Sequence, residues 1–168
     1  MTFKNTQFTI IHHDLKTTPL IPWKVVGKLM WDLTPRILNK MDEIARKYDW
    51  HFNYFVDGYS HSTDYSVIIT GSDLKIVFAS KNIEDLTGYD PYEMVGQTPK
   101  ILQGVNTDLD AVERTREALI SGIAFKARLL NYKKDGVEYG CELDAFPIYN
   151  GNGVLTHHIA FEKEYKLI

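Results

Sequence analysis

Residues 96–108 read Gly-Gln-Thr-Pro-Lys-Ile-Leu-Gln-Gly-Val-Asn-Thr-Asp, a short run with two helix-start signals and a glycine between them. Threonine before proline starts a helix well, because Pro99 has no backbone N–H to leave unsatisfied and the Thr98 hydroxyl can accept a hydrogen bond from a free one. Gly104 is the expected end of this helix, and Asn106 or Thr107 the expected start of the next. The run therefore predicts two helices with a tight connection.

The composition indicates a globular protein with one domain and an extension. The chain has 168 residues, of which 44% are hydrophobic and 24% charged, enough for a core of ordinary size. A net charge of −3 without a Lys/Arg run argues against a nucleic-acid partner. No stretch approaches the ~18 apolar residues of a membrane span. The single cysteine, Cys141, excludes an internal disulfide framework and predicts a reducing, cytoplasmic location.

Residues 1–62 are expected to form an N-terminal extension with one amphipathic helix. Thr34-Pro35 repeats the helix-start signal, and residues 8–11 could form a strand. Apolar residues then recur at helical spacing: Ile37, Leu38, Met41, Ile44, Ala45 and Tyr48. Two alternatives stay open, because this stripe could pack on its own domain or pair with its copy in a dimer. An aromatic group around Trp50 is expected to join the same layer.

Residues 63–168 carry the pattern of an α+β domain. Hairpin turns join two β-branched runs near the start and three strands near the end: strands 65–70, 74–79, about 125–133, about 138–148 and about 155–164. Short helices lie between them, with start signals at Ser80 or Asn82, at Asp90-Pro91 and near Asp108. This order predicts a five-stranded antiparallel sheet with the helices on one face.

The order of elements and four local phrases resemble the PAS family, and most closely its light-oxygen-voltage (LOV) branch. The phrases are residues 96–108, Asp85-Leu86-Thr87-Gly88-Tyr89, the Glu93-x-x-Gly96 step and residues 129–136. The resemblance covers roughly the last two-thirds of the chain. It implies a PAS fold, a sensory role of the bacterial type in signal transduction, and a cavity that in the LOV branch holds a flavin nucleotide.

The resemblance also implies candidate cofactor-binding positions. Gln103 matches the family glutamine, Asn131 the first flavin-facing asparagine, and Arg116 a phosphate-binding arginine. The remaining positions differ from the family: Thr98 stands for an asparagine, Pro99 for the photoreactive cysteine, Lys100 for an arginine, Cys141 for the second asparagine and Glu162 for a glutamine.

These differences weaken the case for flavin. Proline has no nucleophile, so the photoadduct of the LOV branch is excluded. A thiol is a weak hydrogen-bonding group and an ionised glutamate only accepts, whereas the flavin ring edge needs both donors and acceptors. Each lost buried contact costs about 1–3 kcal/mol. FMN is therefore disfavoured, and no other cofactor is indicated.

Strand alternation predicts which side chains face the cavity. Asn131, Cys141, Leu143, His158 and Glu162 are expected to point inward. Glu162 has two alternatives: a partly wet position at a strand end, near Lys100, or a place in a polar cavity that binds a small polar ligand or forms a pH-responsive pair with His158. The adjacent histidines 157 and 158 face opposite sides, so no metal site is expected.

The other face of the sheet is expected to be an interface. Leu130, Tyr132, Ile159 and Phe161 would form an apolar patch there. Such patches are covered or used for association. The extension helix, through Ile37, Met41 and Ile44, is the available cover, from its own chain or from a partner in a homodimer.

The sequence thus predicts a PAS sensory module that is not an enzyme. It shows neither a nucleophile motif nor a glycine-rich phosphate loop. The module would bind a small ligand or a signalling protein partner and signal through association. The alternatives are a cysteine-less LOV-type flavin sensor and a purely structural dimerisation module.

Overall fold

The structure, a computed structural model, describes residues 7–10, 21–22, 35–52 and 65–167. In chain order the elements are β1 (Gln7–Ile10), β2 (Ile21–Pro22), α2 (Pro35–Lys47), β3 (Trp50–Phe52), β4 (Ser66–Gly71), β5 (Ile76–Ala79), α3 (Ile83–Thr87), α4 (Pro91–Met94), the 3-10 helix η1 (Pro99–Leu102), α5 (Leu109–Ile120), β6 (Phe125–Tyr132), β7 (Glu138–Asn150) and β8 (Leu155–Tyr165). None of the helices in these ranges is long and apolar enough to cross a membrane.

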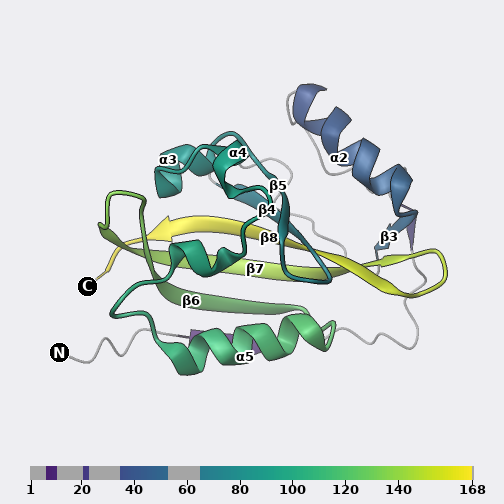
Figure 1. Ribbon diagram of the computed structural model, residues 1–168. Coiled ribbons are helices and arrows are strands. Elements are labelled where there is room, and N and C mark those ends of the chain that lie inside the picture. Colours follow the sequence, from purple (N-terminus) through teal and green to yellow (C-terminus); the bar gives the residue numbers. More distant parts are fainter. Residues whose placement is uncertain (1–6, 11–20, 23–34, 53–64, 168) are drawn as a thin grey trace.

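The five predicted strands form one antiparallel sheet in the order β6-β7-β8-β4-β5. Figure 1 shows the long strands β7 and β8 through the middle of the molecule, with α5 on one side and α2 on the other. The expectation of a helical extension was incomplete, because residues 1–62 also contribute strands β1, β2 and β3 to the sheet.

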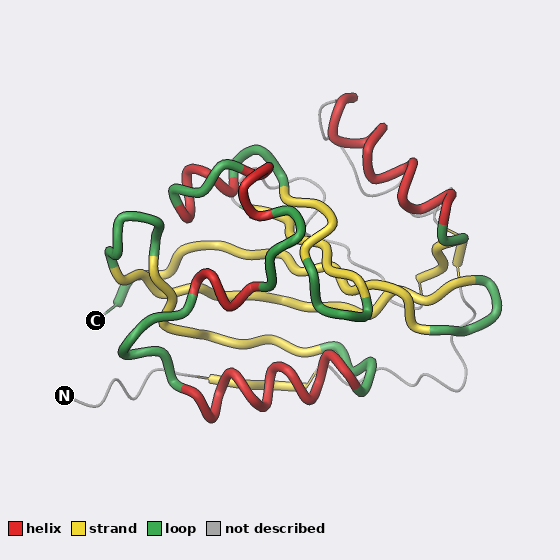
Figure 2. Tube along the Cα trace, viewed as in Figure 1, coloured by secondary structure: helices red, strands yellow, loops and turns green. Residues whose placement is uncertain are grey.

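Strand β1 pairs with the edge strand β6, and β3 pairs with the far end of β7. In Figure 2, β1 is the short yellow segment behind α5. An unpaired sheet edge exposes backbone donors and acceptors, and a short added strand satisfies them. The Phe8 ring, stacked 5.2 Å from the Phe125 ring, anchors β1 at this edge.

Local capping signals explain some of the helix starts. The carboxylate of Asp90 accepts a hydrogen bond from the Tyr92 backbone N–H at 2.7 Å, while the Asp90 N–H donates to Glu93 at 3.0 Å, so α4 begins with the predicted capping box. The helix η1 begins at Pro99 as predicted, but the Thr98 side chain makes no capping hydrogen bond. That part of the prediction was wrong.

The start of α5 also differs from the prediction. Its N-cap is Asp108, which accepts from the Ala111 N–H at 3.1 Å, and neither Asn106 nor Thr107 takes this position. The Thr107 hydroxyl accepts from the Gly104 N–H at 2.9 Å and donates to the Leu130 carbonyl at 3.0 Å. Thr107 therefore ties the loop before α5 to strand β6 instead of capping the helix.

Two apolar clusters lie on the two faces of the sheet. The inner cluster joins the sheet to α3, α4, η1 and α5. The outer cluster joins the other face to the extension and includes Met41, Ala45 and Trp50, which are at most 2% exposed. The predicted alternation is confirmed on β8, where Ala160 packs against the inner cluster while Ile159 and Phe161 belong to the outer one.

The outer cluster contains two of the four residues of the predicted outer patch, Ile159 and Phe161. Leu130 is buried outside both clusters, and the Tyr132 hydroxyl donates to Glu138 at 2.7 Å and accepts from the Asn106 N–H at 2.9 Å. Tyr132 is therefore held by polar groups of Asn106 and Glu138 at the end of β6. Of the predicted helix residues, Met41 is buried in the outer cluster and Ile44 packs against it, whereas the Ile37 side chain lies outside the described part of the chain.

Candidate functional site

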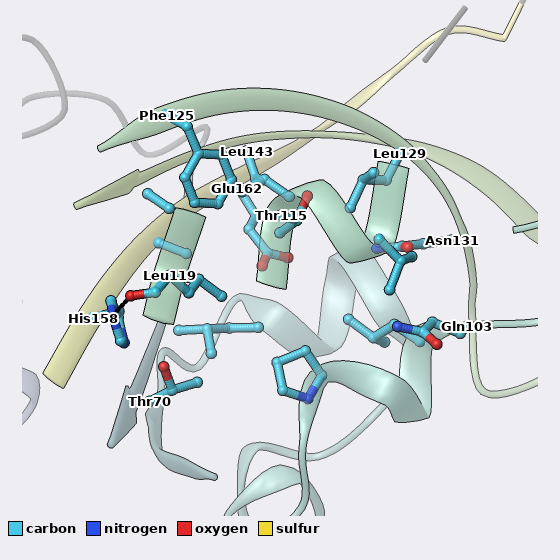
Figure 3. Close-up of a pocket in the computed structure, with 16 residues that line it drawn as sticks. Thr70, Gln103, Thr115, Leu119, Phe125, Leu129, Asn131, Leu143, His158 and Glu162 are labelled. Atoms are coloured by element: carbon cyan, nitrogen blue, oxygen red, sulfur yellow. Dashed lines mark hydrogen bonds between the residues drawn. The ribbon is translucent and has the colours of Figure 1, made fainter. Parts of the chain in front are cut away.

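A cavity of about 100 Å³ lies between the inner face of the sheet, η1 and α5. Strands β4, β6, β7 and β8 supply one wall, and most of the lining side chains are apolar. Five predicted residues line it: Gln103, Asn131, Leu143, His158 and Glu162. Figure 3 shows Gln103 and Asn131 toward one end, His158 and Thr70 toward the other, and the Glu162 carboxyl group near the centre.

Glu162 is the acidic residue in the lining of this cavity. It lies opposite Leu143 in the β7–β8 ladder and is 6% exposed, so the alternative of a wet strand end is wrong. Its hydrogen-bond partner is the Cys141 thiol, whose sulfur lies 3.6 Å from Oε2. Burial raises the pKa of Glu162 to about 7, and the contact with Cys141 only partly opposes this. The carboxyl group is therefore poised between its neutral and charged forms near neutral pH.

His158 is held in one tautomer. The Leu119 carbonyl lies 2.8 Å from Nε2 and can only accept, so Nε2 carries the proton. The other ring nitrogen, Nδ1, is buried and makes no well-aligned hydrogen bond, although the Gly71 backbone lies close enough to the ring to oppose the lowering of its pKa. Burial lowers the pKa of His158, which keeps the ring neutral. Within the described ranges no ion pair joins His158 to Glu162, so the pH-responsive pair is not formed in this structure.

A threonine on α5 adds a further polar atom that sequence reasoning missed. The Thr115 hydroxyl lines the cavity, is buried, and has no hydrogen-bond partner. Val112, Thr115 and Leu119 all line the cavity from α5. Their spacing of three and four residues is the helical period, so a search for one polar residue within the inward stripe of this helix would have found Thr115.

Four candidate residues do not line the cavity: Thr98, Lys100, Arg116 and Cys141. Lys100 is exposed at the surface of η1. Arg116 points away and pairs with Glu113 on the same helix, with 3.2 Å between Nη1 and Oε1. Cys141 is fully buried behind Glu162. The cavity lining therefore contains Glu162 but no lysine or arginine from the described residues.

On the other face of β8, a second polar contact joins this strand to the N-terminal extension. The Trp50 indole N–H donates to Nδ1 of His157 at 3.0 Å, and the Tyr48 ring meets the His157 ring edge-on with centroids 4.5 Å apart. His157 is 3% exposed, and burial lowers its pKa to about 4, so the ring is neutral and accepts this bond. The extension thus touches β8 directly behind the cavity residue His158.

Comparison with known proteins agrees with this architecture. A family model described as "PAS domain" matches residues 64–164. The chain belongs to the PAS family. Rice phototropin-2 (Oryza sativa subsp. japonica) is 39% identical to this PAS chain over 95 residues, which are 56% of the chain and 10% of phototropin-2. The bacterioopsin transcriptional activator of Halobacterium salinarum is 32% identical over 95 residues, 56% of the chain and 14% of that protein.

Blue-light-activated histidine kinase 1 of Erythrobacter litoralis is 35% identical over 85 residues, 51% of the PAS chain and 24% of the kinase. The chain thus spans from a tenth to a quarter of these relatives. Among solved structures, a light-oxygen-voltage domain studied with a flavin analogue matches at a TM-score of 0.58 and 30% identity, covering 61% of this chain and 78% of that one. The light-state Aureochrome1 LOV domain matches at a TM-score of 0.59 and 27% identity, covering 62% of this chain and 84% of that one.

The residues of this PAS cavity do not fit FMN. Pockets for ligands of drug size measure roughly 300–1,000 Å³, several times the 100 Å³ found here. Pro99, which the sequence resemblance aligns with the reactive cysteine of the LOV branch, lines the cavity, and the only cysteine of the chain, Cys141, hydrogen-bonds to Glu162. The resemblance aligns Cys141 and Glu162 with two flavin-facing amides, and here a thiol and a carboxyl group contact each other at 3.6 Å instead. We therefore derive no chemistry through a flavin.

Proposed function

We propose that this PAS domain is a non-catalytic sensory module in which a small ligand in the cavity changes how the N-terminal extension binds the opposite face of the sheet. One observation carries the proposal: strand β8 presents residues to both sides. His158 and Glu162 line the cavity, while His157, Ile159 and Phe161 contact or pack with the extension side. A change in backbone twist at the cavity would move both sets of side chains together.

The output in this proposal is association with another protein. The extension covers apolar residues that would otherwise be exposed, including Ile159 and Phe161. Partial release of α2 would uncover them, and an uncovered apolar patch of this kind binds a partner. The partner is a signalling protein or a second copy of the chain in a homodimer. The buried, unpaired Cys141 supports a cytoplasmic location as part of the same proposal.

The proposal excludes catalysis as the function. In the described ranges the fully buried cavity atoms without a hydrogen-bond partner belong to Thr115 and His158, and neither has the neighbours that would activate a nucleophile. The names of the relatives suggest a blue-light receptor as the rival function. We place it second because the cavity residues do not fit FMN and the resemblance aligns Pro99, a lining residue, with the reactive cysteine.

The test is an absorption spectrum of freshly purified protein, followed by denaturation and mass analysis of released small molecules. We expect a colourless protein that releases a small molecule. A flavin or haem absorption band would overturn the proposal in favour of a photo- or redox sensor. A colourless protein that releases nothing, and whose association is insensitive to a metabolite extract, would overturn it in favour of a structural dimerisation module.

A further inference from the structure

We infer that the cavity ligand is a small organic cation with several N–H donors, of the amidinium or guanidinium type, held by the carboxylate of Glu162. This inference rests on the proposed sensory function and names the class of ligand. Three features of the cavity carry it: the sign of its charge, the acceptor groups that Glu162 and Thr115 offer, and its size. The other polar side chains of the lining, Thr70, Gln103 and Asn131, can both donate and accept, so they are compatible with a ligand that carries donors.

The charge of the lining is the first feature. Glu162 is the acidic residue of the cavity and is 6% exposed, yet no lysine or arginine from the described chain lines the same space. Its partner is a thiol at 3.6 Å, and a thiol is a weak donor. A buried carboxylate without a nearby cation is costly, so a positively charged ligand would supply the missing counter-charge. An anionic ligand would be repelled by the ionised carboxylate of Glu162.

The hydrogen-bonding groups are the second feature. Neutral His158 donates from Nε2 to the Leu119 carbonyl, and its buried Nδ1 lies beside the Gly71 backbone. The acceptors assigned to the ligand are therefore those of Glu162 and Thr115. The Thr115 hydroxyl is buried without a partner and can accept. Together with Glu162 it offers acceptors from two elements, α5 and β8. A ligand that matches them carries donors. A planar amidinium ion can also form two parallel N–H···O hydrogen bonds to one carboxylate.

The volume is the third feature. An engineered cavity of about 150 Å³ in another protein holds benzene, which has six heavy atoms. The 100 Å³ found here therefore suits a ligand of roughly four heavy atoms by the same scaling. Amidinium and guanidinium ions are of this size, whereas nucleotides, flavins and haem are far larger.

The ionisable groups around Glu162 set the expected pH dependence. Burial raises the pKa of Cys141 and of Tyr139 well above their ordinary values, and burial lowers the pKa of His158. These neighbours stay neutral near pH 7, so Glu162 is the group that titrates when a cation binds. Because its pKa is about 7, binding of a cation should tighten about tenfold between pH 6 and pH 8.

The experiment compares three probes with the same number of heavy atoms and nearly the same shape: acetamidinium, acetamide and acetate. Each is titrated into the full chain at constant ionic strength and followed by two-dimensional amide NMR, which also locates the site on β8 and α5. We expect acetamidinium to bind most tightly, acetamide more weakly and acetate not at all. Glu162→Gln should weaken acetamidinium at least about tenfold, the loss of one charge-assisted hydrogen bond.

Glu142→Gln is the matched control. Glu142 lies on the opposite face of the neighbouring strand, paired with Arg128 at 2.6 Å and Lys163 at 3.0 Å, so this variant should keep the wild-type order of probes. Binding of acetate or acetamide in preference to acetamidinium would overturn the inference and leave the proposed function standing. Equal affinity of wild type and Glu162→Gln for acetamidinium would also overturn the inference and leave the proposed function standing. Failure of all three probes to bind would overturn the inference, and the mass analysis of released molecules would decide the proposed function separately.

Discussion

Replacing Glu162 by glutamine should change how the stability of the protein depends on pH. Glu162 is buried in the cavity wall, and burial raises its pKa from 4.5 to about 7. The folded state therefore holds a proton that the unfolded chain has already released between these two pH values. The free energy of unfolding must then fall as pH rises through this window. Glutamine has no proton to lose, so the variant should lack this contribution.

The magnitude follows from the size of the pKa shift. Each pKa unit corresponds to ~1.4 kcal/mol of differential interaction, so the full shift of Glu162 amounts to ~3 kcal/mol. Between pH 5 and pH 7.5 most of this is expressed, and wild type should lose ~2 kcal/mol relative to Glu162→Gln. Urea unfolding of both proteins at the two pH values, followed by circular dichroism, measures the difference directly.

Glu142→Gln again supplies the control. Burial alone would raise the pKa of Glu142, but hydrogen bonds from Arg128 and Lys163 outweigh it and lower the pKa. A group with a lowered pKa stabilises the fold above its unfolded pKa and loses that effect as pH falls. The two variants should therefore change the pH profile in opposite directions. A stability difference between wild type and Glu162→Gln that is the same at pH 5 and pH 7.5 would refute the reasoning.

The remaining predictions concern contacts outside the cavity. Trp50→Phe removes the N–H that His157 accepts at 3.0 Å, so the free energy of unfolding in urea should fall by ~1 kcal/mol. Deleting residues 1–48 removes α2 and uncovers the outer apolar cluster, so size-exclusion chromatography should show aggregates or a new oligomer. Gly104→Ala places a methyl group against the Tyr132 ring, which its hydroxyl contacts hold in place, so thermal unfolding should show a loss of ~1–3 kcal/mol.

Each of these results has a clear opposite. Trp50→Phe with wild-type stability would mean that the bond to His157 contributes nothing measurable. A monomeric, soluble protein after deletion of residues 1–48 would show that the extension does not protect the outer face. A Gly104→Ala variant with wild-type melting would show that Tyr132 moves freely, against the two hydrogen bonds of its hydroxyl.

The predictions that came from short stretches of sequence agree best with the structure. The capping box at Asp90 and the left-handed Gly88 that ends α3 depend on residues within a few positions of one another. The inward and outward faces of β8 follow from the two-residue period of any strand. Such rules act through the backbone itself, so they hold before the chain has any tertiary structure.

The polar contacts of the candidate site could not be derived in the same way. Thr107 binds the Leu130 carbonyl instead of capping α5, and the His157 ring receives a bond from Trp50, 107 residues away in the chain. Glu162 is buried in the cavity wall beside Cys141, whereas the sequence also allowed a partly wet position at a strand end. The residue types, the alternation and the PAS resemblance were determined by sequence alone. Which polar atoms are paired, buried or left without a partner was decided only when packing brought distant segments together, because a hydrogen bond depends on distances that no local period encodes.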